Sequence, residues 1–286
     1  PITTETGQGI FYLPAQFLLL WDFHFMKKVD QWQSTYGKKM ESWLRTLGKI
    51  ESLASFAYLA YDEPFWCHAQ FSKDKRIYRA EKIGHPLIPL QKRVYNHANL
   101  EESKPLWMIT GSNMSGKTTF LRTLGINLVL ALAGGPVMAK SMEISYFDLR
   151  TSITIRDSLE LGHSYFMAEV YKIKEIVDLA KQASPSAPLF YLLDEMLHGT
   201  NSEDRRKAAF SILDFLGKTH SLGAVTTHDL SIATHPILKP LAEQYHFQEE
   251  YGEVLKFDYK LKKGYATQSN ALKIIEMLGI PIHDNE

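Results

Sequence analysis

The eight residues 111–118, GSNMSGKT, constrain the fold of this chain more than any other segment. They fit the pattern G-x-x-x-x-G-K-[ST], in which glycines let the backbone curl so that successive amide groups point at phosphate oxygens. An apolar run at 106–110 precedes them, and an amphipathic segment from Lys117 to about Leu132 follows. A strand, a glycine-containing turn and a helix in this order predict a P-loop nucleotide site.

This motif also predicts which atoms hold the nucleotide. Lys117 would neutralise the β- and γ-phosphates, and the Thr118 hydroxyl would ligate Mg²⁺. The following helix adds the partial positive charge of its N-terminus. We therefore expect ATP and Mg²⁺ to bind at Gly111, Ser112, Asn113, Met114, Ser115, Gly116, Lys117, Thr118 and Thr119.

Two further apolar runs end in polar residues. Residues 189–193 lead into Asp194 and Glu195, as in a Walker B strand. We expect Asp194 to hold Mg²⁺ and Glu195 to polarise the attacking water. Residues 224–226 lead to His228, which we expect to sense the γ-phosphate. The polar segment 198–204 between them either caps a helix or contacts a neighbouring nucleotide site.

From about residue 76, short apolar runs alternate with helical segments. We predict strands at 106–110, 144–147, 152–155, 189–193 and 223–226, and an antiparallel pair at 244–250 and 254–261. We predict helices at 117–132, 167–182, 203–216 and 269–278. Strands separated by helices indicate an α/β fold, with a mainly parallel sheet flanked by helices on both faces.

The N-terminal part differs, because its apolar residues between Phe25 and Ile50 recur at steps of three and four. This spacing predicts a helix over 14–47, ended by Gly48, and a second helix over 50–61. Together they would form a long α-helical hairpin, either an ordinary core hairpin or a lever. We therefore divide the chain into a helical lever or core segment, 1–75, and an ATPase domain, 76–286.

Composition narrows the class of protein. The 32 Lys and Arg residues balance 32 Asp and Glu residues, which argues against a dedicated DNA-binding module but not against a motor attached to one. The single cysteine excludes an intrachain disulfide and favours a reducing, cytoplasmic compartment. The most apolar stretches, 10–21 and 126–139, fall short of the ~20 residues that span a bilayer, so we expect no membrane contact.

Several motifs, in order, resemble the ATPase domain of the MutS mismatch-repair proteins, within the ABC-type ATPase superfamily. The segment TGSNMSGKTT at 110–119 is similar to the family's TGPNMGGKST. HSYFMAEV at 163–170 resembles (R)STFMxEM, DEMLHGTNSED at 194–204 resembles DExGRGTSxxD, and TTH at 226–228 resembles ATH. Upstream, GHP at 84–86 and Asn96 stand where the family has RHP and an asparagine. The likeness covers about residues 83–281.

The resemblance implies partners and further site residues. Two ATPase domains of this family pair head-to-tail, which implies a homodimer with composite nucleotide sites, where Ser164 reaches the partner's γ-phosphate. Tyr259 and Val94 would lie on either side of the adenine, and Asn96 is carried over as a nucleotide-site residue. DNA would be contacted through regions outside this chain, and a downstream repair protein is a further expected partner.

The sequence departs from the family at three positions. His198 replaces an arginine, Arg205 stands where glycine is common, and Tyr165 replaces a threonine. We expect these changes to leave ATP binding intact and to affect turnover or coupling between subunits. The chain also ends soon after Pro281, without the family's C-terminal dimerisation segment, so we expect a dimer that is weak or forms only with ATP.

Three functions remain open on the sequence alone. The leading one is Mg-dependent ATP hydrolysis that switches the conformation of a mismatch-repair or related DNA-processing protein. The alternative is an ATP-binding structural or dimerisation module of a MutS paralogue, with little turnover and a role in recombination control or elsewhere. A small-molecule P-loop kinase is disfavoured, because no arginine-rich lid segment follows the loop.

Overall fold

The computed structural model describes residues 17–112, 114–153, 165–197, 201–250 and 256–265. These residues fall into two units that divide between Tyr61 and Asp62. None of the helices in the described ranges is both long enough and apolar enough to cross a membrane.

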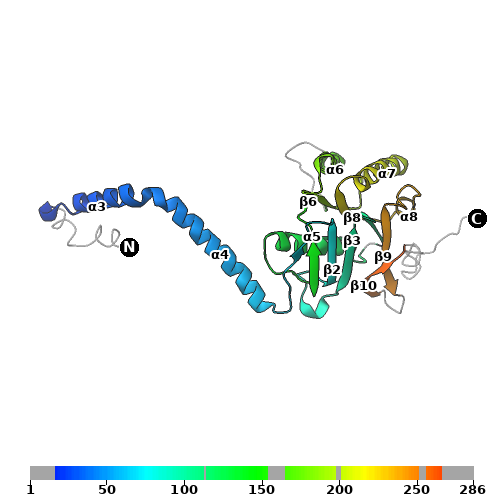
Figure 1. Ribbon diagram of the computed structural model, residues 1–286, viewed down its shortest axis with the longest axis horizontal. Helices are drawn as coiled ribbons and strands as arrows, with labels where there is room; N and C mark the ends of the chain where they lie inside the picture. The colour runs from blue at the N-terminus through cyan, green and yellow to red at the C-terminus, as the bar shows by residue number, and fades with distance from the viewer. Residues whose placement is uncertain (1–16, 113, 154–164, 198–200, 251–255, 266–286) are drawn as a thin grey trace, which may run out of the picture. The chain divides into compact units, whose positions relative to one another are not determined.

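The described residues of the N-terminal unit are mainly helical. Helix α3 (Trp21–Tyr36) passes through a short 3-10 helix, η1 (Gly37–Lys39), into α4 (Met40–Asp62), as Figure 1 shows. The predicted turn at Gly48 is wrong, because α4 runs through it, and residues 21–62 form α3, η1 and α4 in succession instead of a hairpin. A glycine costs a helix only about 1 kcal/mol, which is too little to end it. The interruption lies at Gly37 instead.

The second unit contains a six-stranded sheet in the order β10-β9-β4-β8-β7-β6. Its strands are β4 (Leu106–Thr110), β6 (Asp148–Ser152), β7 (Leu189–Asp194), β8 (Ser221–Thr227), β9 (Ala242–Glu250) and β10 (Lys256–Lys263). All neighbours are parallel except β10, which runs antiparallel to β9. The mainly parallel sheet and the antiparallel pair are confirmed, whereas β6 lies earlier than the predicted 152–155.

A second, four-stranded sheet has the order β1-β5-β2-β3. It consists of β1 (Gln70–Phe71), β2 (Ile77–Ile83), β3 (Asn96–Glu101) and β5 (Ser141–Ile144), with η2 (Leu90–Lys92) between β2 and β3. Strand β5 ends at Ile144, where the sequence predicted a strand to begin. The sequence reasoning did not anticipate this sheet, and the fold is α/β with two sheets.

Helix α5 (Lys117–Leu132) shares one hydrophobic core with both sheets. Its Leu121 and Leu128 pack in the same cluster as Tyr78 of β2 and Phe190 of β7. The Tyr78 hydroxyl also donates a hydrogen bond to Leu124 O at 2.9 Å. This core therefore anchors α5, and with it the segment that precedes the helix, to both sheets.

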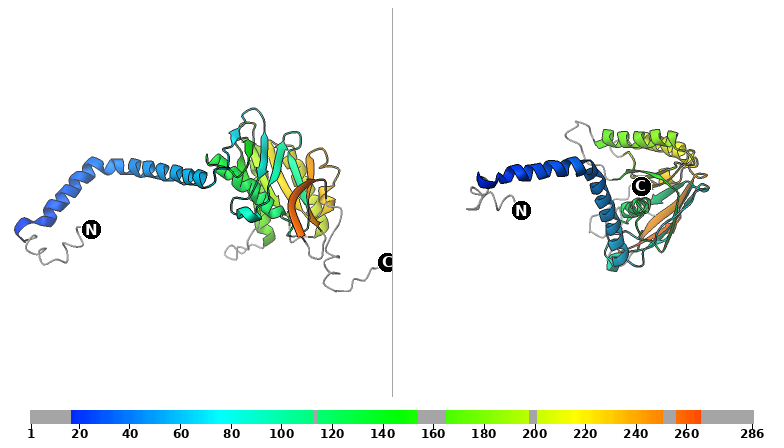
Figure 2. Two further views of the ribbon diagram at one scale, coloured as in Figure 1. Left: turned by 90° about the horizontal axis from the view of Figure 1, so that it is seen from below. Right: turned by 60° about the vertical axis from the view of Figure 1, so that its left-hand side comes forward.

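The opposite face of the six-stranded sheet carries α6 (Tyr165–Gln182), α7 (Ser202–Gly217) and α8 (Leu230–Ala233), which build a second core (Figures 1 and 2). Helices therefore cover both faces, as predicted. The helix predicted at 269–278 lies outside the described residues.

Candidate functional site

Three segments that the sequence singled out lie at one edge of the six-stranded sheet. Strands β4, β7 and β8 are parallel neighbours, and their register pairs Thr110 with Thr227 and Asp194 with Thr226. Polar residues that follow parallel strands meet at the carboxyl edge of the sheet, where ligands of α/β proteins bind. The topology thus joins positions more than 100 residues apart.

The 111–116 loop leaves β4 and enters α5 through two glycines with positive φ. Gly111 has a φ of 148°, and a Cβ there would lie 2.8 Å from Ser115 Oγ and 3.0 Å from Phe247 O. Gly116 has a φ of 105° and is the N-cap of α5. Any other residue would be strained at either position, so the sequence requires glycine for this curl. Asn113 lies outside the described residues.

Lys117 is the first residue of α5 and is only 5% exposed. Its ammonium group donates hydrogen bonds to Gly111 O at 2.9 Å and Ser112 O at 2.8 Å. The same nitrogen lies 3.4 Å from Glu195 Oε1. The loop therefore wraps around a buried positive charge, as a site for an anion would require.

Thr118 and Asp194 meet beside this lysine. Thr118 Oγ1 donates a hydrogen bond to Asp194 Oδ2 at 2.8 Å, and Thr226 Oγ1 donates one to Asp194 Oδ1. A hydroxyl and a carboxylate are the hard oxygen ligands that Mg²⁺ prefers, usually with substrate phosphates and water completing the shell. In the described part of the chain, no three His, Cys, Asp or Glu side chains gather to hold a metal by themselves. The donor set therefore fits a magnesium ion that arrives with phosphate.

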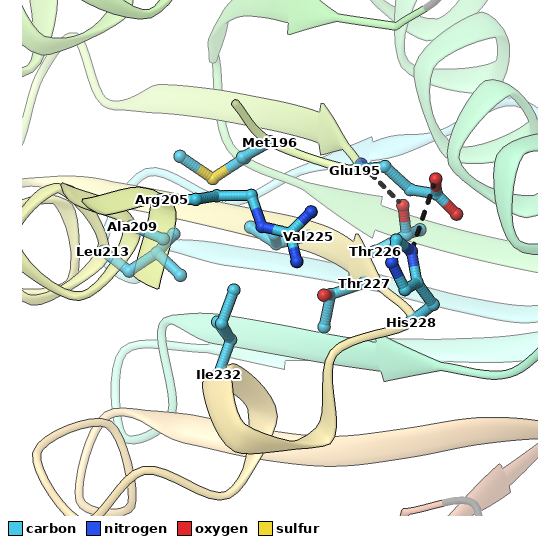
Figure 3. A pocket seen from close by; sticks show the side chains of 10 residues that line it. All are labelled: Glu195, Met196, Arg205, Ala209, Leu213, Val225, Thr226, Thr227, His228 and Ile232. Carbon is cyan, nitrogen blue, oxygen red and sulfur yellow. Dashed lines mark hydrogen bonds and ion pairs between the residues drawn. The ribbon is translucent and has the colours of Figure 1, made fainter. Parts of the chain in front are cut away.

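Glu195 lies between Lys117 and the end of β8, and it contacts both. Its amide donates to Thr226 Oγ1 at 3.2 Å, and its backbone has a φ of 49°. Its carboxylate lies between Lys117 and His228, because Oε1 is 3.4 Å from Lys117 Nζ and Oε2 is 3.6 Å from His228 Nδ1 (Figure 3). The structure thus brings together Lys117, Glu195 and His228, three of the four predicted catalytic residues; Ser164 lies outside the described residues.

A cavity of about 810 Å³ opens beside the loop. This volume is within the usual range for small-molecule sites. Among the predicted residues, its lining includes Val94, Asn96, Met114, Gly116, Lys117, Thr118, Thr119, Glu195 and Tyr259. The structure therefore places both predicted base-contacting residues on the same cavity as the loop.

The four-stranded sheet and its connections supply lining residues that sequence reasoning missed. These are Ile83, Ile88 and Lys92, together with His85. Burial, and then the positive charges of Arg122 and Arg93, lower the pKa of His85. Only His85 lay in a motif, GHP, that could have indicated it. Phe120 and Thr123 of α5 and Phe247 of β9 also line the cavity without having been predicted.

Residues 107–284, more than half of the chain, match the MutS domain V family. The chain belongs to this family. It is 32% identical over 243 residues to the DNA mismatch repair protein MutS of Rickettsia africae (strain ESF-5), covering 81% of this chain and 26% of the relative. The MutS proteins of Rickettsia canadensis (strain McKiel) and Rickettsia felis (strain ATCC VR-1525 / URRWXCal2) are 32% and 31% identical, over 82% and 81% of this chain and 26% of each relative. The chain spans about a quarter of the length of these relatives.

In this domain V, Arg205 has a definite structural partner. Arg205 Nη2 lies 3.3 Å from Asp229 Oδ2, and the two side chains are only 17% and 15% exposed. Arg205 and His228 line the same narrow cavity (Figure 3). Burial raises the pKa of Asp229, but hydrogen bonds from Ser231 and Arg205 outweigh it and lower that pKa overall. The ion pair ties the start of α7 to the residue after His228.

Two polar side chains fix the segments around Glu195 in domain V. Buried Glu169 of α6 accepts a hydrogen bond from the Leu197 amide, a contact that sequence reasoning did not identify. Asn201 accepts hydrogen bonds from the Glu203 and Asp204 amides, which confirms that 201–204 begins a capped helix. Contact of this segment with a neighbouring nucleotide site stays a prediction, and His198 lies outside the described residues.

Proposed function

We propose that this chain binds ATP with Mg²⁺ and hydrolyses it to ADP and phosphate, as the P-loop, ABC-type ATPase module of a MutS-like protein. One observation carries the proposal. Lys117, Thr118, Asp194 and Glu195 converge at one sheet edge, on a cavity of about 810 Å³ that also reaches Val94 and Tyr259. Family membership supports the same activity.

Each residue would then have a separate task. The loop amides, Lys117 and the N-terminus of α5 would bind the phosphates, because all present positive charge to an anion. Thr118 and Asp194 would hold Mg²⁺, which supplies neutralising charge at the phosphate oxygens. Tyr259 and Val94 would hold the base, since a flat ring gains from stacking on an aromatic side chain.

Hydrolysis requires a group that accepts the proton of the attacking water. Glu195 is suited to this task, because its carboxylate lies on the cavity and next to the lysine that would bind phosphate. The ion pair between Glu195 and Lys117 would loosen when phosphate replaces the carboxylate beside the lysine. His228, next to Glu195, would sense the γ-phosphate and orient the carboxylate.

The cellular role proposed is DNA mismatch repair or a related DNA process. The family match supports it, and so does the similarity to DNA mismatch repair proteins of Rickettsia. We propose a homodimer in which Ser164 completes the partner's nucleotide site, with DNA and a downstream repair protein contacted through other regions. ATP bound between two domains would favour the paired state, and hydrolysis would release it.

Calorimetric ATP titration and phosphate release, each with Mg²⁺ and with EDTA, test the proposal. The wild type should bind ATP more tightly with Mg²⁺ than in EDTA, and it should release phosphate only with Mg²⁺. Lys117→Ala should abolish both, whereas Lys140→Ala, whose exposed lysine pairs with Glu81, should match the wild type. Binding without phosphate release would replace the proposal by the alternative of an ATP-binding structural module. Absence of Lys117-dependent binding would refute both.

A further inference from the structure

Asn96 holds the backbone of another strand with both ends of its side-chain amide. Asn96 Nδ2 donates a hydrogen bond to Tyr259 O at 3.0 Å, and Asn96 Oδ1 accepts one from Leu261 N at 2.9 Å. Asn96 belongs to β3 of the four-stranded sheet, and the bonded residues belong to β10 of the six-stranded sheet. The side chain is therefore a link between the two sheets, and it is only 8% exposed.

The segment that Asn96 holds is irregular. The pairing of β10 with β9 shifts register between Phe257 and Leu261, and Tyr259 inside this bulge has a φ of 52°. A residue other than glycine adopts such a conformation only where its surroundings hold it there. Asn96 supplies that hold, because its two hydrogen bonds lie on either side of residue 260.

The bulge determines where the Tyr259 ring lies. Tyr259 Cδ1 is 3.1 Å from the point that a Cβ on Gly116 would occupy. The ring therefore packs over the N-cap of α5 and lines the cavity, and Gly116 leaves room for it. It remains 44% exposed, so one part of its surface is accessible to a ligand.

We propose that Asn96 is a positioning residue for the nucleotide base, which acts by fixing the Tyr259 ring as a stacking surface. This inference rests on the proposed function, and it assigns the triphosphate and the base of the nucleotide to different residues of the site. The loop, Lys117 and Thr118 bind the triphosphate, whereas the Asn96–Tyr259 pair controls the base-dependent part of the affinity. An aromatic platform stabilises a base through its face, so it must be held at a fixed orientation.

Two ligands separate these contributions: MgATP, and magnesium tripolyphosphate, which has the phosphates without a base. Calorimetric titration of the complete 286-residue chain measures both affinities. Tyr259→Ala should weaken MgATP binding about tenfold, because the base loses the aromatic ring on which it stacks. Asn96→Ala should weaken it by about fivefold, and neither substitution should change tripolyphosphate binding by more than about twofold.

A double variant tests whether Asn96 acts through Tyr259. When the ring is absent, its position no longer matters, so Asn96→Ala should add less than about twofold to the loss in Tyr259→Ala. Asn96→Asp keeps an acceptor for the Leu261 amide but loses the donor to Tyr259 O, and it should give an intermediate MgATP affinity. Asn99→Ala is the matched control, because Asn99 lies on the same strand and bonds to Arg79 instead.

Equal weakening of both ligands by a folded Asn96→Ala protein would overturn the inference, as would fully additive losses in the double variant. Circular dichroism and thermal unfolding establish folding. If Asn96→Ala does not fold, the same cycle is run with Asn96→Asp and Tyr259→Ala. A wild type that binds tripolyphosphate and ATP equally well would overturn the inference alone. A wild type that binds neither would overturn the proposed function as well.

Discussion

Thr118 Oγ1 donates a hydrogen bond to Asp194 Oδ2 at 2.8 Å, although 76 residues separate the two in the chain. The bond joins the first turn of α5 to the end of β7. Thr226, at the adjacent position on β8, holds the other oxygen of the same carboxylate. The carboxylate is therefore oriented by two hydroxyls before any ligand enters the site.

Replacement of Thr118 tests whether this pair serves Mg²⁺. Thr118→Ala should weaken ATP binding about tenfold with Mg²⁺ present, because one oxygen ligand and one hydrogen bond to a charged group are lost. In EDTA the variant and the wild type should bind alike, since no metal is held. Thr118→Ser keeps the hydroxyl and is the control. Equal losses with Mg²⁺ and in EDTA would contradict a metal-binding role.

Glu195→Gln should separate binding from turnover. Glutamine has nearly the same shape but cannot accept a proton, so phosphate release should fall at least about 100-fold. ATP affinity should be unchanged or higher, because a negative charge 3.4 Å from Lys117 is removed. Glu203→Gln, an exposed carboxylate paired with Lys207, is the control. Turnover within twofold of the wild type would exclude Glu195 as the proton acceptor.

The Arg205–Asp229 pair should matter for stability. Arg205→Ala leaves the Asp229 carboxylate largely buried without its cation, which should lower the free energy of unfolding by about 2–3 kcal/mol. Lys207→Ala breaks an exposed pair on the same helix and should cost less than about 1 kcal/mol. Urea unfolding followed by circular dichroism gives both values. Equal losses of unfolding free energy in the two variants would contradict the expectation that the buried pair contributes more to stability than the exposed pair.

The lowered pKa of Asp229 gives this pair a pH dependence. The pKa is below its ordinary value of 3.8 in the folded protein, so the folded state favours the charged form. The contribution of the Asp229 charge to the free energy of unfolding is present above pH 3.8. It is lost as the pH falls through the pKa that Asp229 has in the folded protein. The difference in unfolding free energy between the wild type and Asp229→Asn should therefore shrink as pH falls from about 5 to about 3. A difference that stays constant over this pH range would refute the proposed pH dependence of the Arg205–Asp229 pair.

Removal of the hydroxyl group should affect the stability of the protein differently at two buried tyrosines. The Tyr191 hydroxyl is buried without a hydrogen-bond partner among the described residues, and burial raises the pKa of Tyr191. Tyr191→Phe should leave stability unchanged or raise it by up to about 1 kcal/mol. Tyr78→Phe removes the hydrogen bond to Leu124 O and should lower stability by about 1 kcal/mol. Thermal unfolding measures both, and similar losses would contradict the expectation.

The elements around the loop could be predicted from the sequence for clear reasons. Strands β4, β7 and β8 are buried on both faces, so each reads as a continuous apolar run. The second glycine and Lys117 mark the start of α5, and the helix has the predicted bounds. The polar residues at the strand ends then meet because parallel strands share one carboxyl edge.

The second sheet and the N-terminal helices could not be predicted in this way. Strand β2 alternates buried Tyr78 and Ala80 with exposed Arg79 and Glu81, so it lacks an apolar run. Helical periodicity tells which face of a helix is apolar, but not where the chain turns, and the expected hairpin was therefore wrong. Ile83 of β2, which lines the cavity, was missed for the same reason. No sequence pattern indicates the bonds from Asn96 to β10.

Lys117 has a further consequence for how a ligand would come and go. In this structure, the carbonyl oxygens of Gly111 and Ser112 accept hydrogen bonds from its ammonium, and the Glu195 carboxylate lies 3.4 Å from the same nitrogen. An incoming phosphate would exchange one set of oxygens for another instead of meeting an unshielded cation. The contacts that the lysine gives up would offset part of the electrostatic gain on arrival, and on departure the protein's own oxygens would return. If the proposed function holds, such a site would favour repeated loading and emptying over permanent retention.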